Sequence, residues 1–102
     1  MNLAAIIEPV PGELKLSGVI DFRSGPQLRK EGAALIAASQ SRQLRLDCSA
    51  VEKSSSVGVS LLLAFLRDAA AAEKKLVMTG LPLDMRQIAE VSGLTAILAI
   101  EP

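Results

Sequence analysis

The hydrophobic residues of this chain change their spacing several times along the sequence, and this change constrains the fold more than any other feature. In residues 13–16 and 43–48, apolar and polar side chains alternate, which is typical of a strand with one buried face. In residues 24–39 and 56–72 the apolar side chains recur every three or four positions, as on an amphipathic helix. Because strands alternate with helices, the sequence predicts an α/β fold with parallel strand pairs and right-handed crossovers.

Turn-forming residues interrupt the first apolar segment. Pro9, Pro11 and Gly12 lie between two short apolar runs, which predicts two strands joined by a tight turn. Two strands joined in this way pair antiparallel, so the sheet is expected to be mixed.

Capping residues mark the ends of the helices. Ser24 is a candidate N-cap for the first helix, and Pro26 lies in its first turn, where a missing N–H group costs little. Pro82 begins a third helix and Gly93 is placed to end it. The predicted order is β-β-α-β-α-β-α in a single domain over residues 1–102, with about four to five strands. The segment after Gly93 is predicted to be either an edge strand or a tail.

The composition argues against several classes of function. Basic and acidic residues number 11 each and aromatic residues make up 2% of the chain, so nothing favours a nucleic-acid-binding surface. The chain has no histidine, which makes a general base near neutral pH harder to build. Cys48 is the only cysteine, so neither an internal disulfide nor a cysteine metal site can form. We expect Cys48 to be a small core residue.

Other signals of catalysis or membrane insertion are also missing from the sequence. The acidic residues Asp47, Asp84 and Glu90 are scattered, and "SSSVGVS" lacks the ending of a phosphate-binding loop. The N-terminal segment has no basic region of the kind found in signal peptides. No apolar run approaches the ~18 residues that a membrane span needs. We therefore expect a cytoplasmic protein that is not an enzyme and has no cofactor, metal site or membrane span.

Three consecutive serines, Ser54, Ser55 and Ser56, precede the second helix. A single serine suffices as an N-cap, which contributes about 1 kcal/mol. A helix N-terminus also favours anions, so a phosphoryl group on Ser55 or Ser56 would be stabilised there, with Lys53 close by. The residues leave both interpretations open: a helix cap, or a site of phosphorylation.

One side of the second helix carries small and polar residues. At 100° per residue, the side chains that share a face with the last serine are Ser60, Ala64, Arg67, Ala71 and Lys74. The opposite, core-facing side is predicted to carry Val59, Leu62, Phe65, Leu66 and Ala69. Val57, Leu61 and Leu63 flank the small-residue stripe and are expected to be partly covered. The stripe is either a docking face for another protein or an ordinary solvent-facing side.

The segments "LRLDCSAVEKSSSVGVSLLLAFLRDA" and "LVMTGLPLDMRQIAEVSGL", in this order of elements, resemble the STAS domain family. That family includes anti-sigma factor antagonists and the small STAS subunits of lipid-asymmetry ABC transporters, of the MlaB or toluene-tolerance type. The segments "SLLLAFLRDA" and "MTGLP" point toward the transporter branch.

The resemblance implies a non-enzymatic regulatory subunit. It would bind the ATPase subunit of a phospholipid ABC transporter that maintains outer-membrane lipid asymmetry, peripheral to the inner membrane. The expected partner-binding residues are Ser54, Ser55, Ser56, Ser60, Leu63 and Arg67.

An alternative implied by the same resemblance is an anti-sigma factor antagonist regulated by serine phosphorylation. When Gly58 is aligned with the family's glycine, Ser55 takes the position of an aspartate and Ser56 that of the first hydroxyl residue. Val57 takes the position that is phosphorylated in the sigma-regulating branch. These departures favour the transporter branch.

Overall fold

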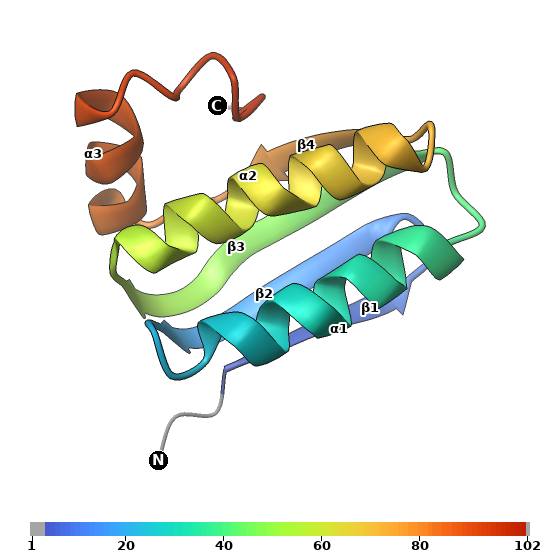
Figure 1. Cartoon of the computed structure of the whole chain (residues 1–102), viewed down its shortest axis with the longest axis horizontal. Helices are drawn as coiled ribbons and strands as arrows, with labels where there is room; N and C mark the ends of the chain where they lie inside the picture. Colours follow the sequence, from blue (N-terminus) through green and yellow to red (C-terminus); the bar gives the residue numbers. More distant parts are fainter. Residues whose placement is uncertain (1–3, 102) are drawn as a thin grey trace.

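Strands and helices alternate along residues 4–101, the part of the chain that the computed structural model describes (Figure 1). In chain order the elements are β1 (Ala5–Val10), β2 (Glu13–Ile20), α1 (Gly25–Ala38), β3 (Gln43–Ser54), α2 (Ser56–Ala71), β4 (Lys75–Thr79) and α3 (Leu83–Val91). This order confirms the predicted α/β fold.

The four strands form one mixed sheet in the order β1-β2-β3-β4. The pair β1–β2 is antiparallel, as predicted for the first hairpin, and β2–β3 and β3–β4 are parallel. Helices α1 and α2 lie side by side on the same face of the sheet, and α3 lies beside the N-terminal end of α2 (Figure 1). The three parallel strands therefore all end at the edge where α2 begins.

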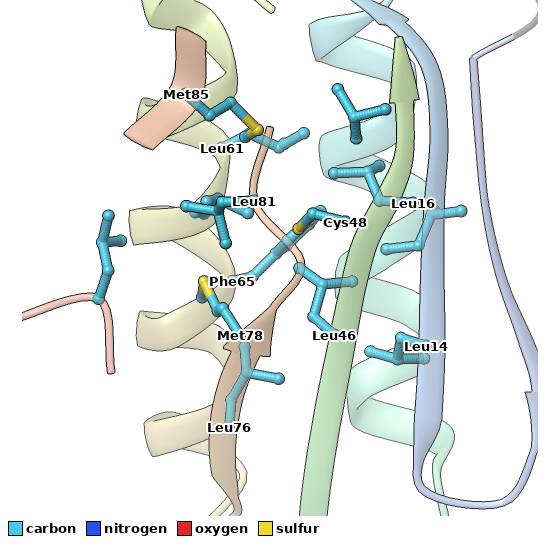
Figure 2. Close-up of a cluster of buried hydrophobic side chains, with 14 of the residues drawn as sticks. Leu14, Leu16, Leu46, Cys48, Leu61, Phe65, Leu76, Met78, Leu81 and Met85 are labelled. Carbon is cyan, nitrogen blue, oxygen red and sulfur yellow. The ribbon is translucent and has the colours of Figure 1, made fainter. Parts of the chain in front are cut away.

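The core lies between the sheet and the two long helices. In β3, Leu44, Leu46 and Cys48 are buried and Arg45 between them is exposed, so the predicted alternation is confirmed. The ring of Phe65 from α2 belongs to the same buried cluster as Leu46 and Cys48 (Figure 2). Cys48 is the small core residue that we expected, with no exposed surface.

The segment after α3 is a tail rather than a full strand. Gly93 follows the end of α3, as predicted, and residues 95–99 form turns. A single parallel bridge then joins Ile100 to Met78 of β4, and Leu98 is buried. The sheet thus has four strands, and the tail covers part of the β4 edge.

Ser24 stands at the N-cap position of α1 but does not cap the helix with its side chain. Its hydroxyl instead donates to the carbonyl oxygen of Val19 and accepts from the N–H group of Asp21. These bonds hold the loop between β2 and α1 in place. Within residues 4–101, the helices are all too short or too polar to cross a lipid bilayer.

Candidate partner-binding site

The three consecutive serines, Ser54 to Ser56, form the turn between β3 and α2, which we call the serine turn. It lies between the loop that joins β2 to α1 and the loop that joins β4 to α3 (Figure 1). In open α/β sheets, ligands bind outside the carboxyl ends of the parallel strands. The serine turn occupies this position.

Ser54 faces inward, which corrects the prediction that its hydroxyl meets a partner. Strand β3 extends through Ser54 and turns its side chain into the core, leaving 6% exposed. The hydroxyl donates to the carbonyl oxygen of Ser55, 2.8 Å away. The N–H group of Ser54 donates to Oδ2 of Asp84 in α3, at 2.9 Å.

Ser55 is the N-cap of α2, so the capping interpretation is confirmed for this residue. Its hydroxyl oxygen accepts from the N–H group of Val57 at 3.2 Å. Its own N–H group donates to the carbonyl oxygen of Ile20 at the end of β2, at 3.0 Å. The turn is therefore fastened to β2 as well as to α3.

Ser56 is the first residue of α2, and it is exposed. Its hydroxyl makes no hydrogen bond to any other residue in the range 4–101, whereas the hydroxyls of Ser54 and Ser55 are both engaged. Of the three serines, Ser56 is therefore the one that is exposed and whose hydroxyl makes no hydrogen bond within residues 4–101.

Gly58 allows the first turn of α2 to approach both β3 and α3. A Cβ atom at this position would lie 1.9 Å from Oγ of Ser54 and 3.1 Å from Cε of Met85. Both neighbouring side chains are buried, so neither can move aside easily. Any larger residue at position 58 would therefore force the side chain of Ser54 out of its present position.

The predicted core-facing side of α2 is confirmed, with Leu66 half-buried and Val59, Leu62, Phe65 and Ala69 buried. The small-residue stripe is only partly open. Ser60, Arg67 and Ala71 are exposed and Leu63 is half-buried, but Ala64 and Leu61 are buried. We expected Leu61 to be partly covered and Ala64 to lie on an open stripe, and both expectations are wrong. Helix α1 packs against this side of α2 and buries both side chains.

Lys74 also departs from the predicted stripe. It lies beyond the end of α2, and its amine donates to the carbonyl oxygens of Ile36, Ala37 and Ser39 at the end of α1. Lys74 therefore joins α1 to the start of β4 and contributes nothing to an exposed face of α2.

An apolar groove of about 370 Å³ lies beside the serine turn, between the β2–α1 loop and α2. Phe22 lines this groove and is 73% exposed. It is one of only two phenylalanines in the chain, which has no other aromatic residue. The residues lining the groove are Phe22, Gly25, Pro26, Arg29, Val57, Ser60, Leu61 and Ala64. Because Ser60 lines the groove and also belongs to the exposed stripe, the two surfaces are continuous.

The sequence did not predict this groove, because its walls come from both α1 and α2. The spacing of apolar residues along one helix does not show where a second helix will pack against it. The available signal was Phe22, an aromatic residue in a predicted loop.

One ion pair and one cation–π contact involve charged groups beside the groove. Arg29 of α1 forms a two-pronged ion pair with Asp68 of α2. The guanidinium of Arg23 lies 5.6 Å from the centre of the Phe22 ring, within the range of a cation–π contact. Across residues 4–101, no cluster of three or more acidic or cysteine side chains is arranged to hold a metal ion. The site presents hydroxyl and apolar groups, which suit protein contacts.

Comparison with protein-family models gives a match over residues 4–99 to the family described as Mlab, STAS domain. The chain is a STAS domain of this family. The fold class and the order of elements agree with this assignment.

Solved structures of two kinds are similar to this STAS domain. One chain of the Acinetobacter MlaFEDB complex, in an ATP-bound Vtrans2 conformation, aligns with a TM-score of 0.82 and 25% identity over 95% of this chain and 99% of that chain. An anti-sigma factor antagonist from Mycobacterium paratuberculosis aligns with a TM-score of 0.80 and 25% identity over 100% of this chain and 86% of that chain.

The anti-sigma factor antagonist SpoIIAA in its unphosphorylated form shares the fold, with a TM-score of 0.75 and 16% identity over 96% of this chain and 85% of that chain. The comparison with curated proteins gives no significant match. The family and the fold of this STAS domain therefore rest on the family model and on the solved structures.

Proposed function

We propose that this STAS domain is a non-enzymatic regulatory subunit that binds the ATPase subunit of a phospholipid ABC transporter. In this role it would support the transport that keeps phospholipids out of the outer leaflet of the outer membrane. It would lie in the cytoplasm, held at the inner membrane through the transporter complex. The family match and the likeness to almost the whole of one MlaFEDB chain support this role.

The observation that carries the proposal is the free hydroxyl of Ser56 at the start of α2, beside an open apolar groove. Small side chains at Ser56 and Ser60 would let a partner backbone come close. Apolar surface buried in the groove would supply free energy at roughly 25 cal/mol per Å². Leu63 and Arg67 would extend the contact along α2, and Ser55 would act through the helix cap that it forms.

Binding would act on the ATPase by favouring one of its states. Coupling free energies between sites are typically about 1–3 kcal/mol, which corresponds to a change of roughly 5–150-fold in an equilibrium. A subunit without catalytic groups of its own can therefore still control turnover.

The test is the affinity of the purified domain for the ATPase subunit of its own transporter, measured by biolayer interferometry. Ser56→Arg places a long charged side chain on the turn, and we expect it to weaken binding at least tenfold. Gln40 is exposed in the loop that follows α1, at the other end of that helix from the β2–α1 loop. Gln40→Arg is therefore the matched control and should bind like the wild type. A Ser56→Arg domain that binds the ATPase subunit with full affinity contradicts the proposal.

A second candidate is an anti-sigma factor antagonist switched by phosphorylation. The likeness to the Mycobacterium paratuberculosis antagonist favours it, as does the accessible hydroxyl of Ser56. Val57 argues against it, because the position that is phosphorylated in that branch carries no hydroxyl and lines the groove. Mass spectrometry of the protein from cells separates the two, since a stoichiometric phosphate on Ser55 or Ser56 supports the antagonist.

A further inference from the structure

We infer that the first turn of α3 belongs to the partner-binding surface, with Leu83 as its apolar contact and Asp84 as the positioning residue that ties it to the serine turn. The inference rests on the proposed function and deepens it, because the occupant is the same ATPase subunit.

Asp84 uses both of its carboxylate oxygens. Oδ1 accepts from the N–H group of Met85 at 2.8 Å, within the first turn of α3. Oδ2 accepts from the N–H group of Ser54 at 2.9 Å, thirty positions away in the chain. One carboxylate thus joins the start of α3 directly to the turn that presents Ser56.

Packing reinforces this link. Met85, the residue after Asp84, is fully buried, and its Cε lies against Gly58 in the first turn of α2. Because interiors are close-packed, a displacement of α3 would be passed on to Ser54 and to the start of α2. The N-terminal ends of α2 and α3 therefore behave as one unit.

The carboxylate at the serine turn comes from α3 and not from the turn itself. By the alignment given above, Ser55 replaces the aspartate that the family's turn usually carries. In this chain, Asp84 of α3 brings a carboxylate to the turn from outside the motif. Helix α3 is therefore joined to the serine turn by a hydrogen bond that the residues of the turn itself do not predict.

Leu83 lies next to Asp84 and is 68% exposed. The hydrogen bond from Ser54 to Asp84 holds the start of α3 beside the serine turn, and this end of α3 lies on the opposite side of the turn from the β2–α1 loop (Figure 1). Phe22 and Leu83 are two large, strongly exposed apolar side chains, and the serine turn lies between the β2–α1 loop and the start of α3.

The size of a stable interface supports the extension. Specific interfaces bury about 800 Å² on each partner. This is about one seventh of the 5859 Å² that this chain exposes, so we expect the interface to extend from Ser56 and the exposed stripe onto apolar surface on both sides. The matching partner surface would carry a polar group for Ser56 with apolar side chains on both sides of it.

The first experiment measures the affinity of the ATPase subunit for Leu83→Ser. Serine is well tolerated at a helix start, so the variant should fold normally. We expect binding to weaken at least fivefold. Val10→Ser removes a similarly sized apolar side chain, 49% exposed on β1, and should change the affinity by less than twofold.

The outcomes separate this inference from the proposed function. If Ser56→Arg abolishes binding and Leu83→Ser binds like the wild type, the surface ends at the serine turn and the inference fails alone. If Ser56→Arg leaves the affinity unchanged, the proposed function itself fails.

A second experiment tests the positioning role of Asp84. Asp84→Asn keeps the shape but replaces one accepting oxygen with an amide group, so only one of the two N–H groups retains an acceptor. We expect weaker ATPase binding together with at least tenfold faster hydrogen exchange at the N–H group that loses its acceptor, either that of Ser54 or that of Met85. Glu90→Gln, an exposed acidic position further along α3, is the control. Unchanged exchange at the N–H groups of both Ser54 and Met85 in Asp84→Asn would overturn the link.

Discussion

Gly32 of α1 lies against the ring of Phe65 of α2, so closely that a Cβ atom at position 32 would stand 2.3 Å from Cε1 of the ring. Phe65 is fully buried between the helices and the sheet, and its ring has no free space to enter. The missing side chain at Gly32 therefore sets how closely α1 and α2 pack. The groove beside the serine turn depends on that packing.

Gly32→Ala should therefore destabilise the domain, even though alanine is the better helix former by about 1 kcal/mol. Overpacking of a core typically costs about 1–3 kcal/mol, so we expect a net loss in the free energy of unfolding measured by urea titration. Adding Phe65→Leu should recover part of the cost of Gly32→Ala, because the smaller side chain relieves the clash. Additive effects in the double variant would show that the two residues do not compete for space.

Lys74 should matter more for stability than its neighbour Lys75. The amine of Lys74 donates to three carbonyl oxygens at the end of α1, where helical carbonyl groups lack partners within the helix. Lys74→Met keeps the apolar stem and removes the donor, and we expect a loss of about 1–2 kcal/mol in urea unfolding. Lys75→Met, at an exposed position in β4, should change stability by less than about 0.5 kcal/mol. Equal losses of stability in Lys74→Met and Lys75→Met would show that the amine of Lys74 does not cap the C-terminal end of α1.

The spacing of residues was enough to predict most of the fold. Each buried strand shows its own alternation, as at Leu44, Leu46 and Cys48, and each helix has an apolar side. Local sequence also indicated that one of the three serines could cap α2, because a helix N-terminus needs an acceptor from within a few residues, and the structure identifies this residue as Ser55.

The details of the site depended on contacts between elements, which spacing does not reveal. Ser54 is buried because β3 continues to pair with β2 through two irregularities in register, and these fix which way each side chain points. Ala64 and Leu61 are buried because α1 covers them, and helical spacing cannot show where a neighbouring helix will lie. Asp84 reaches the serine turn only through the packing of α3.

Glu8 should make the stability of the domain depend on pH in the acid range. The N–H group of Gly12 donates to its carboxylate at 3.0 Å and the hydroxyl of Ser39 at 2.7 Å, and these bonds lower the pKa of Glu8. A lowered pKa in the folded state gives stability that is present above the unfolded value of about 4.3 and is lost as the pH falls through the folded value.

Glu8→Gln should therefore flatten the decline in the free energy of unfolding below about pH 4.3. Ser39→Ala should move the pKa of Glu8 part of the way back up, because it removes the second of the two donors. A carbon-detected NMR titration of the Glu8 carboxylate measures this shift directly. If the pKa of Glu8 in the wild type is at or above the ordinary value, its carboxylate does not accept the two hydrogen bonds from Gly12 and Ser39.

Cys48 should be unreactive until the domain unfolds. It has no exposed surface, and burial raises the pKa of its thiol to about 12, with the Asp47 carboxylate acting in the same direction. Because the thiolate is the reactive form, a disulfide reagent should label the native protein slowly at neutral pH and the urea-unfolded protein rapidly. Ser49→Cys introduces a thiol at the exposed neighbouring position, and that thiol should react at once in the native state. Rapid labelling of Cys48 in the folded wild type would refute this prediction.

Phe22 should contribute to partner binding and hardly at all to folding. Its side chain is 73% exposed at the rim of the groove, so Phe22→Ser should change the free energy of unfolding by less than about 0.5 kcal/mol. An exposed aromatic residue that becomes buried in a complex can contribute about 2 kcal/mol, so the same variant should weaken ATPase binding about thirtyfold. Ile7→Ser, 51% exposed on β1, should leave the affinity unchanged. Equal binding by Phe22→Ser and the wild type would place the groove outside the interface.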